Sequence, residues 1–331
     1  MRGTHGECKF FRTFVADMEN KKLTPLRFAP CGIEEQPWGR ADYLLADLGL
    51  VDSLCTEGCL KGSTLSDILQ TYLERLVGET SFDWYGTQFP VLVKRLTVRG
   101  RTSLHITMDD ETAEQRYDAF GKTALWLVEA AGAEAKLYLG LKKETGARQF
   151  FQACQDGSAA KYLHTVTPRP GETYLITPGM VHAAQDVTLL EIAESSEAWF
   201  RIWDWGATER ETELEEAFDL IDFGPWQRPA RLAEGLLAAT PQFTVNRIGL
   251  TQPLKSTRDE EDTFLLYYCT RGKAQLQAWG RNYALAPGEL LLVPAEVTEF
   301  FLLPEAPDTE LLEVRMDPRP EEDLVAPAEE E

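Results

Sequence analysis

Two histidines lie in sequence contexts in which they could act as metal ligands. His182 ends the segment PGMVH, and His105 lies in the alternating segment SLHITM. Side chains alternate between the faces of an extended strand, so His105 shares a face with Ser103 and Thr107. Two imidazoles and one further ligand can hold a zinc ion. The alternative for each is a buried histidine that hydrogen-bonds to the backbone, which is the commoner role of a lone histidine.

Few other side chains are placed to complete a metal site. Asp109 and Glu194 are the candidate carboxylates, although a pair such as Asp109 and Asp110 is more often a helix cap or a solvated turn. His5 and His164 lie in segments that do not suggest ligands. The scattered cysteines match neither a zinc ribbon nor a redox motif, and we expect reduced thiols.

Strands and helices must position these residues. Thr64 followed by Asp67 is a capping-box pattern, and apolar residues continue at helical spacing to Gly78, which predicts one helix over residues 64–78. Residues 88–108 are rich in β-branched side chains and predict two strands separated by a turn at residues 99–101. The second of these strands carries His105.

An internal repeat organises the rest of the chain. LWLVEAAGAEAKLYLG (125–140) resembles LLYYCTRGKAQLQAWG (265–280), and PGETYLITPGMVH (170–182) resembles PGELLLVPAEVT (287–298). Each copy predicts a strand, a glycine turn, a strand, a Pro-Gly turn and a strand ending at proline, as in a jelly roll. Thr298 stands where the first copy has His182, so one barrel could hold the site and the other serve as a scaffold.

Helices are predicted within and after the first copy. KKETGARQFFQACQDGSAAKYL (142–163) has helical apolar spacing and is an insertion that the second copy lacks. ERETELEEAFDLIDF (209–223) predicts an acidic linking helix with one apolar side. We therefore expect a polar N-terminal extension (1–22) that is flexible, a first barrel domain with helical insertions (23–240), a second barrel domain (241–318) without metal ligands, and a disordered acidic tail (319–331).

Composition limits the class of ligand. The chain has 331 residues, 44% of them hydrophobic and 26% charged, as in a globular protein of two domains. A net charge of −21 argues against nucleic acid and anionic membrane surfaces as partners, and an anionic small substrate would need a local basic pocket. No apolar run reaches the roughly 18 residues that a membrane span needs. Charged residues occupy the place near the N-terminus where a signal peptide would have its apolar region. We expect a cytoplasmic protein, and no protein partner is inferred.

Seven motifs together resemble a known family, the type I zinc-dependent mannose-6-phosphate isomerases. In chain order they are PWG (Pro37–Gly39), LKGSTLSDIL (Leu60–Leu69), FPVLVK (Phe89–Lys94), MDDETA (Met108–Ala113), GKTALW (Gly121–Trp126), PGMVHA (Pro178–Ala183) and FRIWDWG (Phe200–Gly206). The resemblance runs from Leu23 to about Gly224, and the remainder fits the second barrel of that family. It implies a mainly β fold of two cupin-type jelly-roll barrels with helical insertions.

The resemblance also implies a zinc site, from which this chain departs. The family binds zinc through a glutamine and a histidine of Q-x-H-P-D-D, the glutamate of G-K-x-E and the histidine of P-x-x-x-H. The matching residues here are His105, Thr107, Ala124 and His182. His105 and His182 are competent ligands, Thr107 is a poor one, and Ala124 cannot coordinate a metal.

The remaining functional positions of the family are present. Arg201 and Lys122 match residues that the resemblance makes catalytic, and Lys94 and Ser103 match substrate-binding positions. The implied function is that of an aldose-ketose isomerase interconverting mannose 6-phosphate and fructose 6-phosphate, with a sugar phosphate as its small-molecule ligand. Two alternatives follow from Thr107 and Ala124: a non-catalytic sugar-phosphate-binding or regulatory cupin that has lost zinc, or a metal-independent epimerase or lyase on the same barrel.

Overall fold

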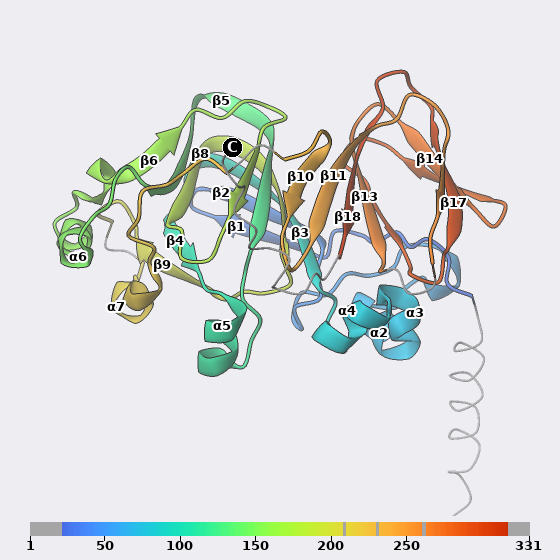
Figure 1. Cartoon of the computed structure of the whole chain (residues 1–331), viewed down its shortest axis with the longest axis horizontal. Helices are drawn as coiled ribbons and strands as arrows, with labels where there is room; N and C mark the ends of the chain where they lie inside the picture. Colours follow the sequence, from blue (N-terminus) through green and yellow to red (C-terminus); the bar gives the residue numbers. More distant parts are fainter. Residues whose placement is uncertain (1–21, 208–209, 230–231, 260–262, 317–331) are drawn as a thin grey trace, which may run out of the picture. The chain divides into compact units, whose positions relative to one another are not determined.

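The computed structural model describes residues 22–207, 210–229, 232–259 and 263–316. The predicted flexible extension, apart from Lys22, and the predicted disordered tail lie outside these ranges. The chain forms two compact units (Figure 1). Unit 1 takes the chain up to Phe28, Leu54–Phe89 and the chain from Thr244; unit 2 takes Ala29–Ser53 and Pro90–Phe243. Each unit is built from segments that are separated in the sequence, so the bounds of the units differ from those of the predicted domains. The predicted domain bounds remain a prediction.

Unit 2 contains the sheet that carries the histidines. Its strands follow the order β1-β2-β3-β8-β4-β9, and β5 pairs with β6, β7 and β8. Their bounds are β1 (Gly32–Gln36), β2 (Gly39–Leu45), β3 (Val91–Arg101), β4 (Leu104–Thr107), β5 (Ala124–Leu141), β6 (Leu163–Val166), β7 (Thr173–Ile176), β8 (His182–Glu194) and β9 (Trp199–Trp203). Unit 2 also contains β10 (Leu236–Ala239), which is not part of this sheet. The two strands predicted within residues 88–108 are β3 and β4, but they separate at residues 102–103 rather than at residues 99–101.

The long strands β5 and β8 lie side by side as the central pair of this sheet (Figure 1). The predicted glycine turn of the first repeat copy is wrong, because β5 runs through Gly132 as one strand with register shifts on either side. The partner strand turns at Asp186, whose φ is +48°. The Asp186 carboxylate accepts a hydrogen bond from the Glu134 N–H at 2.9 Å, which fastens the irregular part of the pair.

The helical segments of unit 2 include the two predicted from apolar spacing, one of them short, and one at residues 110–117 that the spacing did not predict. They are α5 (Asp110–Tyr117), α6 (Ala147–Gln155), α7 (Leu214–Ala217) and the 3-10 turns η2 (Ala159–Lys161) and η3 (Phe218–Leu220). The α6 helix buries Phe150, Ala153 and Cys154 in the core. The acidic linking helix is confirmed only as α7 and η3, with Leu214 and Ala217 buried.

Unit 1 contains the second repeat copy and a group of short helices (Figure 1). Its strands pair in the orders β11-β18-β13-β16 and β12-β17-β14-β15. The bounds are β11 (Thr244–Gly249), β12 (Leu254–Thr257), β13 (Leu265–Arg271), β14 (Ala274–Ala278), β15 (Arg281–Leu285), β16 (Leu290–Val293), β17 (Glu299–Pro304), β18 (Glu310–Arg315), η1 (Gly58–Leu60), α2 (Leu65–Tyr72), α3 (Glu74–Val77) and α4 (Glu79–Tyr85). The one helix predicted over residues 64–78 is therefore divided, because Leu73 adopts a φ of +49° between α2 and α3.

The repeat is visible in the backbone of both units. The Gly171 N–H donates to the Val128 carbonyl at 2.8 Å, and the Gly288 N–H donates to the Cys269 carbonyl at the same distance. Each bond ties the Pro-Gly turn to the strand that begins its copy. Each copy encloses apolar side chains, around Leu139 and Leu189 in the first and Leu276 and Leu291 in the second. The protein is mainly β, as predicted. Among the described helices, none has the length and apolar character that crossing a bilayer requires.

Candidate functional site

A pocket in unit 2 gathers most of the chemistry-bearing residues. Strands β1 to β5, β8 and β9 and the segments that follow them supply its walls. The lining includes two histidines (His105, His182), four cationic side chains (Lys94, Lys122, Arg201, Arg210) and three carboxylates (Glu34, Glu191, Glu197). The cations outnumber the carboxylates in a chain whose overall charge is −21. This is the kind of local basic pocket that an anionic ligand would need.

The two histidines face each other across the sheet. His105 on β4 is the register partner of His182 on β8, and their ring centroids lie 6.2 Å apart. The His182 Nδ1 lies 2.9 Å from the Met180 carbonyl, which assigns the proton to Nδ1 and leaves Nε2 as the free nitrogen. Burial and the neighbouring charges hold the pKa of His105 well below its usual value, and burial lowers the pKa of His182. Both rings are therefore neutral near pH 7.

A buried carboxylate lies between two lysines on the pocket wall. The Glu191 carboxylate is 3.7 Å from the Lys94 Nζ and 3.9 Å from the Lys122 Nζ, and it accepts a hydrogen bond from the Trp126 indole at 2.8 Å. Burial would raise the pKa of Glu191, but the two ammonium groups outweigh burial and lower it. Burial, followed by the charge of Lys94, lowers the pKa of Lys122.

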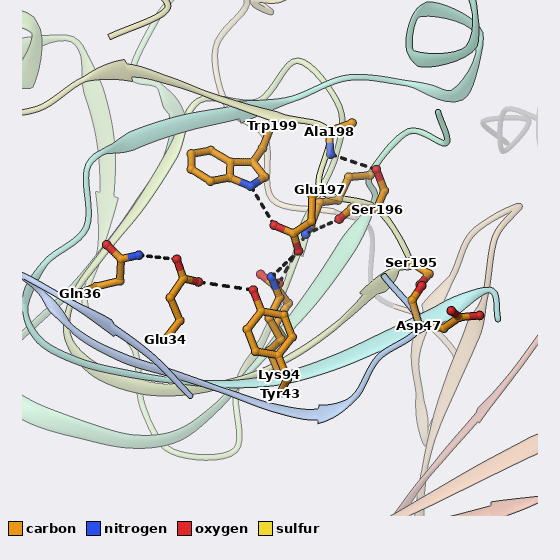
Figure 2. Close-up of polar contacts among 12 residues, drawn as sticks. Glu34, Gln36, Tyr43, Asp47, Lys94, Ser195, Ser196, Glu197, Ala198 and Trp199 are labelled. Atoms are coloured by element: carbon orange, nitrogen blue, oxygen red, sulfur yellow. Dashed lines mark hydrogen bonds and ion pairs between the residues drawn. The ribbon is translucent and has the colours of Figure 1, made fainter. Parts of the chain in front are cut away.

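Lys94 has a second carboxylate partner at the rim of the pocket. The Lys94 ammonium donates to the Glu197 carboxylate at 3.2 Å, and the Trp199 indole donates to the same carboxylate at 3.2 Å (Figure 2). Burial would lower the pKa of Lys94, but Glu191 and Glu197 raise it overall. Lys94 therefore remains a fixed positive charge with two anionic neighbours.

The predicted substrate residue Ser103 does not line the pocket but supports a residue that does. The Ser103 hydroxyl donates to the buried Asp204 carboxylate at 2.8 Å. That carboxylate also accepts two hydrogen bonds from Arg210, at 2.8 Å from Nε and 2.9 Å from Nη2. Ser103 and Asp204 thereby fix the direction of the Arg210 guanidinium, which lines the pocket.

The other predicted metal-site positions do not add a metal ligand beside the two histidines. Thr107 lines the pocket, whereas the buried Ala124 offers no donor atom. Asp109 caps α5 by accepting a hydrogen bond from the Thr112 N–H at 2.8 Å, which is the helix-cap alternative. Glu194 accepts from the Thr123 N–H at 2.8 Å and is not a lining residue.

Sequence reasoning missed Glu191, Glu197 and Arg210. Counting by twos from His182 places Glu191 on the opposite face of β8, yet both side chains line the same pocket. The turn of β8 at Asp186 changes the alternation between them. Comparing the two repeat copies does not reveal that the alternation of side chains changes at Asp186. Arg210 follows a strand end and lies in no motif, so nothing in its sequence context indicated its position.

The fold and the pocket define a cupin protein, and comparisons with known proteins agree. A family model described as the mannose-6-phosphate isomerase cupin domain matches residues 236–304. Mannose-6-phosphate isomerase from Streptococcus mutans is 24% identical over 257 residues, which are 73% of this chain and 78% of that protein. Mannose 6-phosphate isomerase from Bacillus subtilis has a fold similar to this one, with a TM-score of 0.75 at 19% identity, covering 88% of this chain and 100% of that chain. This chain therefore has the cupin fold, and in sequence it is similar to mannose-6-phosphate isomerases.

The zinc that the family implies does not fit the donors of this chain. A zinc-bound mannose 6-phosphate isomerase shares the fold, with a TM-score of 0.73 at 12% identity over 89% of this chain and 100% of that chain. Within the part of this chain that the structure describes, no group of three or more His, Cys, Asp or Glu side chains could hold a metal ion. A catalytic zinc ordinarily takes three protein ligands. His105 and His182 supply two, and the family positions Thr107 and Ala124 add no imidazole or carboxylate.

Proposed function

We propose that this chain is a mannose-6-phosphate isomerase-like protein whose unit 2 pocket binds a hexose 6-phosphate. The proposed reaction is the interconversion of mannose 6-phosphate and fructose 6-phosphate. The single observation that carries the proposal is the pocket itself, where Glu191 is fixed between Lys94 and Lys122 beside the paired histidines. The similarity of the chain to mannose-6-phosphate isomerases supports the same ligand class.

The proposed reaction sets demands that these residues can meet. Moving a hydrogen between C1 and C2 of a sugar passes through an enediolate, so the site needs a proton acceptor and positive charge beside the developing oxyanion. The neutral His182 has a free ring nitrogen as a candidate acceptor. The ammonium groups of Lys94 and Lys122 would stabilise the oxyanion, because both are buried with Glu191 where charges interact strongly. No step of this scheme passes through zinc.

The predicted catalytic residues keep a role in this scheme. We propose Lys122 as a catalytic residue, because it combines burial with a place on the pocket wall. Arg201 is proposed to contact the anionic end of the substrate rather than the reacting carbons. Lys94 is proposed as a substrate-binding residue, while Ser103 acts through Asp204 and Arg210.

A second candidate function is a sugar-phosphate-binding protein without catalysis. The observation that favours it is the incomplete donor set at His105 and His182, since Ala124 and Thr107 stand at the other family ligand positions. This protein would bind the same ligand in the same pocket. Turnover, rather than binding, separates the two candidates.

A coupled assay of fructose 6-phosphate formation from mannose 6-phosphate tests the proposed reaction. We expect turnover by the full chain and a loss of at least about 100-fold in kcat for Lys122→Met, which removes the ammonium while keeping the length of the side chain. Lys143→Met, a change of the same kind at an exposed position outside the pocket, should leave turnover unchanged. Binding of mannose 6-phosphate without turnover would exclude the isomerase and select the second candidate.

A further inference from the structure

Three buried polar atoms of the unit 2 pocket have no hydrogen-bond partner within the described part of the chain. They are Thr107 Oγ1, Arg201 Nε and Arg210 Nη1. Buried polar atoms of native proteins are nearly always hydrogen-bonded, so such an atom on a pocket wall indicates a ligand or an ion. Each of the three can donate a hydrogen bond. The group that satisfies them is therefore an acceptor.

The three residues come from neighbouring segments, and we call them the donor corner. Thr107 and Arg201 lie on the paired strands β4 and β9, with Trp199 as the register partner of Thr107 and His105 as that of Arg201. Diagonal neighbours across such a pair lie within reach of long side chains. The Arg201 Nη1 donates to the Glu211 carbonyl at 3.3 Å, so the Arg201 side chain also reaches the segment that begins with Arg210.

The donor corner contains two guanidinium groups, of which one is balanced by an ion pair. Arg210 is balanced by the Asp204 carboxylate, which accepts two hydrogen bonds from it and one from Ser103. Among the described residues, no carboxylate lies within ion-pair distance of the Arg201 guanidinium. The Glu213 carboxylate lies close by, but it accepts a hydrogen bond from the backbone N–H of Arg201 at 3.0 Å and not from the guanidinium. The Arg201 guanidinium therefore attracts an anion and repels a cation. The corner is therefore unsuited to a metal ion and suited to an anionic group.

We propose that the donor corner binds the phosphate group of the substrate and that Arg210 is a substrate-binding residue positioned by Ser103 and Asp204. This inference rests on the proposed hexose 6-phosphate ligand. A phosphate monoester has several acceptor oxygens and negative charge, and guanidinium groups are well matched to it in geometry. Lys94 and Lys122 already lie beside the Glu191 carboxylate, which partly neutralises their charge. The phosphate is therefore assigned to the donor corner and the sugar carbons to the side of the two lysines.

The experiment compares dissociation constants of mannose 6-phosphate and inorganic phosphate, measured by calorimetry on the full chain. Thr107→Val keeps the shape of the side chain and removes its donor, while Arg210→Lys keeps a positive charge beside Asp204 and loses the guanidinium fork. We expect each change to weaken both ligands about tenfold or more. Arg116→Lys, in an exposed pair with Asp219 outside the pocket, should leave both affinities unchanged.

The unfolding temperature of the ligand-free Thr107→Val variant separates a binding role from a structural one. We expect it to rise, because the change removes a buried hydroxyl without a partner. A lower unfolding temperature for this variant with unchanged affinities would overturn the proposed phosphate-binding role. Mannose 6-phosphate binding that neither Thr107→Val nor Arg210→Lys weakens would also overturn it. If inorganic phosphate binds and both variants weaken it while mannose 6-phosphate does not bind, the donor corner stands and the proposed ligand is wrong.

Discussion

Glu194 is a buried acid that the fold keeps protonated near neutral pH. It lies at the end of β8 with 1% of its surface exposed, and it accepts a hydrogen bond from the Thr123 N–H at 2.8 Å. Burial first, and then the charge of Asp110, raise the pKa of Glu194 to about 8. In the unfolded chain this carboxyl has an ordinary pKa and is ionised at pH 7.

The contribution of Glu194 to the stability of the protein should therefore fall as the pH rises between about 4.5 and about 8. In that window the folded state holds a proton at Glu194 that the unfolded state has released, so unfolding becomes easier by about 1.4 kcal/mol for each pH unit. Below the window both states are protonated and this contribution is fully present. Glu194→Gln mimics the protonated acid, so we expect it to remove this slope and to stabilise the protein at pH 8.

Urea unfolding at several pH values measures the effect of Glu194→Gln directly. The comparison variant is Glu114→Gln, at an exposed position on α5, which should keep the pH dependence of the unmodified chain. Parallel pH profiles for the unmodified protein and Glu194→Gln would show that Glu194 is ionised in the folded state, contrary to our account.

At the residue scale, the sequence was sufficient to predict the pocket residues that lie within recognisable motifs. His105, His182, Lys122 and Arg201 lie together in one pocket, as the predicted strands and the family motifs led us to expect. Ser103 was placed by strand alternation, but β4 begins only after it. Its hydroxyl turns to Asp204 instead, because that buried carboxylate needs donors.

At the element scale, the irregular pairing of β5 with β8 decides which side chains face the pocket. A side chain at Gly132 would meet the Asp186 carboxylate, since a Cβ there would lie 2.0 Å from Oδ2. The same carboxylate holds the Glu134 N–H. Gly132 therefore leaves room for the Asp186 carboxylate against β5, and the shift in alternation beyond Asp186 brings Glu191 to the pocket.

Gly132→Ala should destabilise unit 2 by about 1–3 kcal/mol, because the Asp186 carboxylate must move away from the added methyl group and lose its hydrogen bond to the Glu134 N–H. Urea unfolding measures this loss. Gly146→Ala is the matched control in the same unit, since nothing lies within 4 Å of a Cβ at that position and its φ of −62° suits any residue. Equal stabilities for the two variants would mean that the Asp186 carboxylate can move without loss and does not fasten β5 to β8.

Elements were predictable where local signals and packing agreed. Thr64 does cap α2, accepting from the Asp67 N–H at 3.1 Å, and the second repeat copy has the predicted strands and turns. The predictions failed where the tertiary structure decides the backbone. Leu73 takes a positive φ that no local pattern indicates, and β5 continues through Gly132 where its equivalent in the second copy turns.

At the scale of the whole molecule, a strongly acidic chain carries a pocket in which cations outnumber carboxylates. The net charge of −21 slows the approach of an anionic ligand, while Arg201 and Arg210 offer local attraction and directed hydrogen bonds. Higher salt weakens the long-range repulsion between chain and ligand. The same cations oppose a metal ion next to the histidines. We therefore propose that this pocket recognises a sugar phosphate by charge and hydrogen bonds and does not need zinc for binding.

The dissociation constant of mannose 6-phosphate, measured on the full chain with a metal chelator and again with added zinc, tests this account most directly. We predict the same affinity in both conditions within about twofold, because the donors proposed for the ligand are Thr107, Arg201 and Arg210 and none of them depends on a metal. Binding that appears only when zinc is present would contradict the account and would show that His105 and His182 hold a metal with ligands that the structure does not bring together.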